Sequence, residues 1–324
     1  IYPQEAAGAK PLFAPAPMFT PLALRGLTLP NRLGTQQCVH TKAGADGPGL
    51  LLTEIVAVSA EGRVTPRDPC LYRPEDLAQW QHFVAEKHAC GTTRLALQLG
   101  HAGRRGSTRP RDNGLDLPLR TGNWPLLAAS PIPYTPFSQV PRAMDEADMQ
   151  RILQSFVQAA RMAEEAGFDL LQLHFAHGYL LASFLSPLTN QREDEFGGNL
   201  TRRMRYPLEV FDAVRAAWPE HKPLSVALPA SDGVRGGLGV EDAVMFAREL
   251  KDHGCDLLTI LAGQTTIESE LPYGHGYLTA LSDRMRNEAG LPTLLGGYLT
   301  TSNEINTILA AGRGDLCIVT PAPV

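Results

Sequence analysis

Short apolar runs alternate with stretches of helical periodicity along most of the chain, and this alternation limits the fold more than any other feature. Residues 145–167 show it best. Apolar residues spaced by three or four form one helical stripe there: Met149, Ile152, Phe156, Ala160 and Ala163. Gly167 ends the stripe, and the apolar run FDLLQLH follows at once. Repeated units of this kind are typical of α/β proteins with a parallel sheet.

The same unit recurs and yields eight predicted strands. Further helices are predicted over residues 74–89, 208–218, 240–254, 280–290 and 301–312. The strands, in chain order, are NRLGTQQC, LLTEIVAVS, RLALQLGH, FDLLQLH, PLSVAL, CDLLTIL, PTLLGG and LCIVT. Eight near-continuous apolar strands favour a closed (β/α)8 TIM barrel over an open sheet. An open dinucleotide-binding sheet would also need G-x-G-x-x-G after its first strand, and none is present there.

The predicted barrel is incomplete at two places. About a dozen residues, VHTKAGADGPGL, separate the first two strands, too few and too rich in glycine for the usual crossover helix. No helix is predicted after the last strand. The opening IYPQEAAGAKPLFAPAPMF reads as a linker because it is rich in alanine and proline. We therefore predict a linker-like tail over residues 1–17 and a barrel over residues 18–324.

Composition and charge favour a small-molecule partner in the cytoplasm. The net charge is -5 and the sequence shows no cluster of lysine and arginine, which argues against a nucleic-acid or anionic membrane surface. The 5 cysteines lack C-x-x-C spacing, which predicts free thiols in a reducing compartment. No apolar run approaches the roughly 20 residues of a membrane span.

Polar residues and glycines gather where the predicted strands end. In barrels of this type the chemistry lies at the carboxyl ends of the strands. Those ends hold Gln98 and His101; His174, His177 and Tyr179; Gly263 and Gln264; and Gly296 and Gly297. We therefore expect these side chains on one rim of the barrel.

The group His174, His177 and Tyr179 permits three interpretations. Both histidines could simply be hydrogen-bonded residues of the core or loop. They could bind a metal, although zinc needs a third ligand and the nearest acidic residues, at 193–195, lie a long loop away. In the third interpretation two N–H donors hold a developing oxyanion while the phenol supplies a proton, which suits hydride addition to an electron-poor C=C.

Two glycine-containing loops add candidate anion sites. GHAGRRGS, residues 100–107, follows a strand and is either a plain basic loop or an anion site. LLGGYLT, residues 294–300, places Gly296 and Gly297 between a strand and a helix, where backbone N–H groups can approach a phosphate. A simple tight turn is the alternative for the second loop.

Several long segments resemble the old yellow enzymes, a family of FMN-dependent ene-reductases built on a (β/α)8 barrel. They are HFAHGYLLASFLSPLTNQREDEFGGNLTRRMRYPLEV, LTEIVAVSAEGRVTP and LALQLGHAGRRGST. The segment LDLPLRTGNWPLLAASPIPYTPFSQVPRAM resembles more narrowly the reductase half of the bifunctional 2-aminobenzoyl-CoA or salicylyl-CoA monooxygenase/reductases.

The resemblance implies roles for particular residues. His174 and His177 would donate to the substrate oxygen, and Tyr179 would donate the proton. Gln98 would contact the pyrimidine edge of FMN, Ala57 and Cys38 would lie beside its ring, and Gly296 and Gly297 would hold its phosphate. The implied electron donor is NADH or NADPH. The implied partners are a small molecule such as a CoA thioester, a fused flavin monooxygenase domain and further copies of the chain.

The chain departs from the family pattern around FMN. The first strand ends in Gln36, Gln37 and Cys38 in place of the usual Pro-Met, and Ala227 occupies the position of an expected arginine. The last strand continues into TPAPV without the expected arginine. Two hypotheses follow. In the first, the chain uses FMN to reduce a cyclic or aryl-CoA-type C=C. In the second, the barrel holds no flavin and acts either as an isomerase or tautomerase or as a non-catalytic domain of a monooxygenase fusion.

Overall fold

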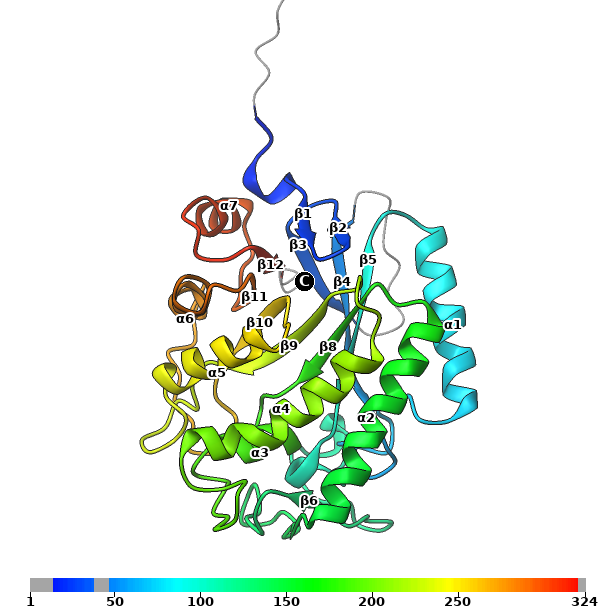
Figure 1. The fold of residues 1–324 in the computed structure, drawn as a ribbon, viewed down its shortest axis with the longest axis vertical. Helices are drawn as coiled ribbons and strands as arrows, with labels where there is room; N and C mark the ends of the chain where they lie inside the picture. The colour runs from blue at the N-terminus through cyan, green and yellow to red at the C-terminus, as the bar shows by residue number, and fades with distance from the viewer. Residues whose placement is uncertain (1–13, 38–46, 320–324) are drawn as a thin grey trace, which may run out of the picture.

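The computed structural model describes residues 14–37 and 47–319, and eight parallel strands close into a barrel at its centre (Figure 1). Neighbouring strands follow one another in chain order, and the last pairs with the first. The strands are β3 (Leu33–Gln37), β4 (Leu50–Ala57), β5 (Arg94–Gly100), β8 (Leu170–His174), β9 (Leu224–Pro229), β10 (Leu257–Leu261), β11 (Thr293–Leu295) and β12 (Leu316–Ile318). The predicted (β/α)8 barrel is therefore confirmed.

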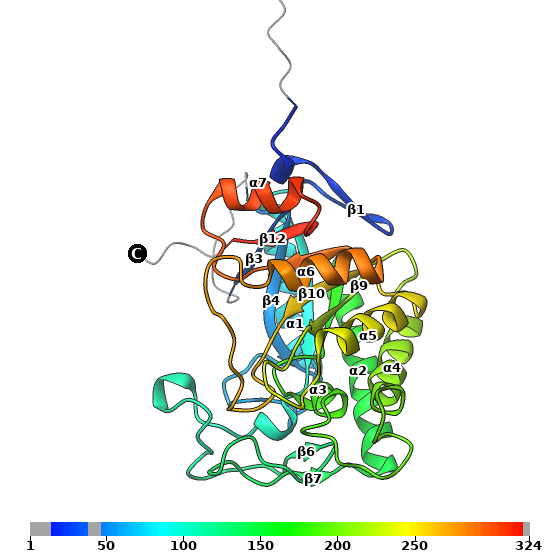
Figure 2. The same ribbon diagram turned by 90° about the vertical axis from the view of Figure 1, so that its left-hand side faces the viewer.

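Helices cover the outside of the barrel (Figures 1 and 2). They are α1 (Pro74–Ala89), α2 (Glu146–Ala166), α4 (Leu200–Ala217), α5 (Val240–Asp252), α6 (Thr279–Arg284) and α7 (Ser302–Ala310), and α6 continues into the π turn η4 (Met285–Ala289). Residues 38–46 and 320–324 lie outside the described residues. The predictions that the first and last barrel helices are missing fall largely on those residues and stay predictions.

Capping residues explain where two helices begin. The Asp145 side chain accepts a hydrogen bond from the backbone N–H of Asp148 at 2.8 Å, and α2 starts at the next residue, as predicted. The predicted start of α4 at residue 208 was wrong. The Asn199 side chain accepts from the backbone N–H of Arg202 at 3.1 Å, so the helix begins at Leu200 and runs through the buried Pro207.

A short hairpin, β1 (Leu22–Leu24) and β2 (Leu27–Leu29), covers the amino-terminal mouth of the barrel. Leu24 and Leu29 are buried against leucines inside the barrel. In the turn, the backbone N–H of Gly26 donates to the His221 carbonyl at 3.0 Å, and a Cβ at Gly26 would lie 2.5 Å from that oxygen. Two three-residue strands give too little alternation to be detected in the sequence.

The inner face of the barrel changes from apolar to polar toward the carboxyl ends of the strands. Leu170 on β8 packs with Leu257 on β10 in a buried apolar cluster near the hairpin. Two residues further along the same strands, on the same face, come Gln172 and Thr259. His174 follows on β8. The polar end of the interior is therefore the end at which the predicted site residues lie.

Loops and short elements at this end form the lower part of Figures 1 and 2. They include η2 (Gly103–Arg105), η3 (Arg111–Asn113), the strand pair β6 (Leu127–Ala128) and β7 (Arg142–Ala143), and α3 (Leu180–Leu185); the remaining turn η1 (Pro17–Phe19) precedes the hairpin. Among the described residues, no helix is both long and apolar enough to span a membrane.

Candidate active site

Strand register brings the predicted cofactor and substrate residues onto one end of the barrel interior. His174 of β8 is paired in register with Ala227 of β9, and Ala57 of β4 with Gly100 of β5. Gly100 lies two residues after Gln98, so Ala57 and Gln98 share the inner face. The structure therefore brings together Ala57, Gln98, His174 and Ala227. Cys38 lies outside the described residues.

His174, His177 and Tyr179 form a compact cluster at the end of β8. The ring centroids of His174 and His177 are 5.0 Å apart, and those of His174 and Tyr179 are 5.3 Å apart. The chain turns sharply between the two histidines and the tyrosine, with φ of 59° at His177 and 66° at Gly178. Tyr179 then precedes α3 as its N-terminal flanking residue. The turn brings the three candidate side chains of one short segment close together.

A chain of buried polar groups fixes the orientation of His174. The Gln98 side-chain nitrogen donates to the backbone carbonyl of Thr53 at 3.3 Å. Because a carbonyl can only accept, the nitrogen of the Gln98 amide must face Thr53 and its oxygen must face away from Thr53. That oxygen accepts from Gln172 Nε2 at 2.9 Å and lies 2.8 Å from His174 Nδ1. His174 Nδ1 must therefore carry a proton.

The opposite ring nitrogen of His174, Nε2, is buried and has no hydrogen-bond partner among the described residues. In the neutral ring with Nδ1 protonated, Nε2 holds a lone pair and accepts rather than donates. A buried polar atom without a partner is costly, so Nε2 marks a position where a ligand can bind. In the neutral ring, Nε2 becomes a donor only when Gln98 releases Nδ1.

The charge states of the cluster follow from its burial. Burial lowers the pKa of His174 well below its ordinary value, and the charges of His177 and Arg105 lower it further. Burial, with the charges of Arg105 and Arg111, lowers the pKa of His177 to about 4. Burial also raises the pKa of Tyr179. At neutral pH the site therefore holds two neutral imidazoles and a protonated phenol.

The two arginines of GHAGRRGS hold the rim loops together. Arg105 Nη1 donates to the His177 carbonyl at 2.8 Å, and its Nη2 donates to Asp116 at 3.0 Å. The guanidinium also lies 3.9 Å from the ring centre of Tyr134. Arg104 donates to the backbone carbonyl of Thr265. The interpretation of this segment as an anion site is not supported, because protein carbonyls and a carboxylate already engage both arginines.

Gly296 and Gly297 form an open turn after β11. Gly297 has φ of 94°, and a Cβ there would lie 3.0 Å from the Tyr277 ring, so the position requires glycine. The nearest atom to a Cβ at Gly296 would be in Ile318, at 3.6 Å. The turn thus leaves room for a ligand on the Gly296 side.

Most of these residues fit FMN, the cofactor that the resemblance implies. An amide at Gln98, small side chains at Ala57 and Ala227, and the glycine turn suit a flat ring and its phosphate. The positive charge expected from an arginine on β9 is absent. Ala227 occupies that position, fully buried and paired in register with His174 on one side and Thr259 on the other, and β9 carries no lysine or arginine. The reduced ring would therefore have no arginine from β9 to stabilise its anionic form.

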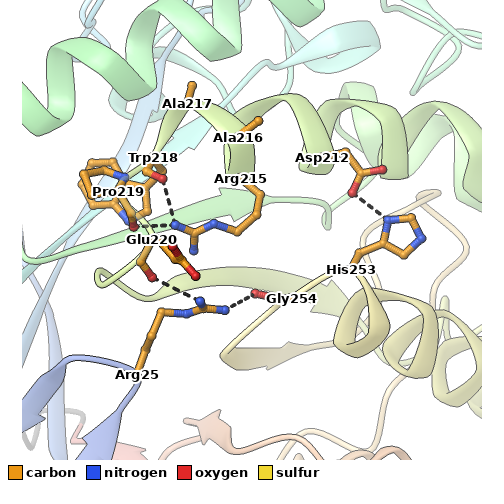
Figure 3. Close-up of a pocket in the computed structure, with 10 residues that line it drawn as sticks. All are labelled: Arg25, Asp212, Arg215, Ala216, Ala217, Trp218, Pro219, Glu220, His253 and Gly254. Carbon is orange, nitrogen blue, oxygen red and sulfur yellow. Dashed lines mark hydrogen bonds and ion pairs between the residues drawn. The ribbon is translucent and has the colours of Figure 1, made fainter.

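A cavity of about 650 Å³ lies at the opposite, amino-terminal end of the barrel (Figure 3). Arg25 of the hairpin donates to Asp256 at 2.8 Å and to the Glu220 carbonyl at 3.1 Å. Arg215 donates to the carbonyls of Trp218 and Pro219. Because backbone and carboxylate oxygens already satisfy both cations, we assign this cavity a structural role in fixing the hairpin.

Metal binding was the other open interpretation of the histidine pair. Across residues 14–37 and 47–319, no group of three or more His, Cys, Asp and Glu side chains is placed to hold a metal ion. The described part of the site therefore offers two imidazoles without the third protein ligand that a zinc site needs.

Comparisons with known proteins agree on one family. Residues 17–320 match the NADH:flavin oxidoreductase / NADH oxidase family. The chain is 32% identical to an NADPH dehydrogenase of Geobacillus sp. (strain WCH70), over 92% of this chain and 88% of that protein. It is 30% identical to an NADPH dehydrogenase of Bacillus subtilis (strain 168), over 93% of this chain and 89% of that protein.

Solved structures support the fold. Morphinone reductase superposes with a TM-score of 0.75 at 24% identity, covering 95% of this chain and 86% of that chain. A complex of 2-naphthoyl-CoA reductase with 2-naphthoyl-CoA superposes with a TM-score of 0.81 at 19% identity, covering 94% of this chain. The chain spans 50% of the length of that second structure. The barrel, the residues at its polar end and the family match over residues 17–320 agree. The chain therefore belongs to the NADH:flavin oxidoreductase / NADH oxidase family of old yellow enzymes, which are FMN-dependent oxidoreductases that take electrons from NADH or NADPH.

Proposed function

We propose that this chain reduces an electron-poor C=C conjugated to a carbonyl or thioester, in a cyclic or aryl-CoA-type substrate. The observation that carries the proposal is the cluster of His174, His177 and Tyr179 at the polar end of the barrel, with His174 Nε2 buried and without a partner among the described residues. FMN, when bound and reduced, supplies the hydride to the β-carbon.

The protein's own groups manage the oxygen and the proton. The imidazole of His177 has no hydrogen-bond partner among the described residues, and it holds the substrate oxygen as charge develops there. His174 joins it once Gln98 releases Nδ1 and the proton moves to Nε2. Because Tyr179 stays protonated to high pH, it gives its proton to the α-carbon and recovers one from water. The overall change consumes one NAD(P)H and one proton for each C=C reduced.

Gln98, Ala57, Gly296 and Gly297 are the residues that would hold FMN. Gln98 would meet the polar edge of the ring, Ala57 leaves room beside it, and the glycine turn admits the phosphate. Cys38 would lie beside the ring as well. The narrow resemblance of residues 115–144 supports an aryl-CoA substrate and a fused monooxygenase domain. Self-association and a cytoplasmic setting, the latter favoured by cysteines without C-x-x-C spacing, are further parts of the proposal.

The visible spectrum of the purified protein tests the central claim. We expect a flavin absorbance that NADPH or NADH bleaches without oxygen, and that returns when 2-cyclohexenone or an aryl-CoA thioester is added. Mass spectrometry should then find a substrate heavier by two hydrogens. A colourless protein that cannot be loaded with FMN would rule the proposal out, and so would bleached flavin that no such acceptor reoxidises.

A further inference from the structure

The loop after η2 contains a structured turn that reaches out from the barrel rim, shown in turquoise at the lower left of Figure 2. Residues Thr108 and Pro118 form an antiparallel bridge. The Arg109 N–H donates to the Leu117 carbonyl at 2.9 Å, and the Leu119 N–H donates to the Ser107 carbonyl at 3.0 Å. Backbone hydrogen bonds therefore hold the base of this turn, residues 107–121, in one shape.

The turn encloses a cavity of about 340 Å³ whose polar lining consists of hydrogen-bond donors and carries no carboxylate. The lining residues are Arg109, Pro110, Asn113, Leu119, Arg120 and Thr121. The only two acidic residues of the segment face other arginines instead. Asp116 pairs with Arg105 at 3.0 Å and Asp112 with Arg67 at 3.5 Å.

Two arginines of the turn, Arg111 and Arg120, are exposed and have no hydrogen-bond, ion-pair or aromatic partner among the residues that the structure describes. Five arginines stand against two aspartates between residues 104 and 120, in a chain whose net charge is -5. Four of the five lie within residues 104–111. Arg109 and Arg120 line the cavity. An unpaired guanidinium group beside neutral donors suits a phosphate.

Charge effects connect this turn to the candidate active site. The Arg111 charge contributes to the lowered pKa of His177 and acts on Tyr179 as well. Asp116 of the turn is tied to Arg105, whose other nitrogen binds the His177 carbonyl. The turn is therefore linked to the loop that carries His177 through Arg105.

We propose that Arg109 and Arg120 of the cavity, with Arg111, which follows Pro110 of its lining, bind the phosphorylated ADP portion that NADPH and CoA thioesters share. The inference rests on the proposed function, since that function requires one such molecule as electron donor and admits the other as substrate. NADPH carries the extra phosphate on the 2′ oxygen and CoA on the 3′ oxygen, so the two sources can be separated.

Calorimetric titration with 2′,5′-ADP and 3′,5′-ADP tests the site without turnover. We expect the unaltered protein to bind one of them, and the double variant Arg111→Gln/Arg120→Gln to bind it about tenfold more weakly or worse, since charge-assisted hydrogen bonds are lost. Both arginines are exposed and unpaired, so the variant should fold. Arg161→Gln, an exposed arginine on α2, is the matched control and should bind as the unaltered protein does.

The preferred probe identifies the source. Weaker 2′,5′-ADP binding with a raised KM for NADPH and an unchanged KM for NADH assigns the site to the electron donor. Weaker 3′,5′-ADP binding with a raised KM for an aryl-CoA thioester assigns it to the substrate. The inference is wrong if neither probe binds the unaltered protein. It is also wrong if the double variant binds both probes with the same affinity as the control variant. Because titration needs neither flavin nor turnover, failure of the proposed reaction would be seen separately in the spectrum.

Discussion

At the scale of the residue, the candidate site depends on which nitrogen of His174 carries the proton. The carbonyl of Thr53 determines the position of that proton. It fixes the orientation of the Gln98 amide, and the amide oxygen then binds the protonated Nδ1 of His174. The sequence predicted that His174, His177 and Tyr179 lie together, and the structure places them so. It could not predict the tautomer, because the residues that determine it lie on separate strands.

Replacement of Tyr179 by phenylalanine removes one proton and little else. We expect kcat for C=C reduction to fall about 100-fold, since general acids contribute on that order. Reduction of the flavin by NADPH and the affinity for substrate should hardly change. Stopped-flow measurement of the two half-reactions separates these effects, and Tyr72→Phe, on a loop outside the barrel, is the control. An unchanged reoxidation rate would remove Tyr179 from the role of acid.

At the scale of the element, one buried carboxylate joins three rim segments. Asp232, after β9, accepts from the Ser186 hydroxyl beyond α3 at 2.6 Å and from the Leu238 N–H at 2.6 Å. It also accepts from the hydroxyl of Thr265, whose carbonyl binds Arg104. Loops from three different strands therefore share one anion, and their relative positions depend on it.

Replacement of Asp232 by alanine should loosen this rim. The change leaves buried donors without an acceptor, so we expect the free energy of unfolding to fall by about 3 kcal/mol. Urea denaturation measures the loss. Asp252→Ala, at the exposed end of α5, is the control and should stay within about 0.5 kcal/mol of the unaltered protein. Equal stabilities for both variants would contradict the assignment.

At the scale of the whole molecule, several histidines are buried in neutral form, and this makes the fold sensitive to acid. Burial lowers the pKa of His101 to about 4, against the partly compensating charge of Glu61. The unfolded chain therefore takes up a proton near pH 6.5, whereas the folded protein does so only near pH 4. The unfolded state binds more protons between these values, so stability falls as the pH drops through that window.

Urea denaturation at a series of pH values measures this effect. The unaltered protein should lose stability between about pH 6.5 and pH 4, and His101 should account for roughly 3 kcal/mol of the loss at most. His101→Asn keeps an acceptor for the Gly103 N–H, which now binds His101 Nδ1 at 3.1 Å. The free energy of unfolding of this variant should fall less steeply between about pH 6.5 and pH 4 than that of the unaltered protein. His221→Gln, at an exposed histidine, is the control and should fall as steeply as the unaltered protein. The same slope in all three proteins would refute the assignment.

The sequence by itself determined the barrel and the segment that carries the candidate site residues. Apolar strands alternating with amphipathic helices have few stable arrangements other than a closed parallel barrel, and strand polarity then places every carboxyl end at one rim. This sufficed to place Gln98, His174, Gly296 and Gly297. The same reasoning did not predict the start of α4, because the helix begins directly after the capping residue Asn199 and continues through an internal proline. It also did not predict the hairpin at the amino-terminal mouth of the barrel.

Only the tertiary structure decided what the charged residues do. Arg104 and Arg105 look in the sequence like a basic loop open to an anion, but carbonyls and carboxylates from distant loops satisfy them. Arg111 and Arg120, less conspicuous in the sequence, are the ones left without partners among the described residues. Hydrogen-bond and ion-pair partners are set by contacts between segments far apart in the chain, and local periodicity carries no information about such contacts.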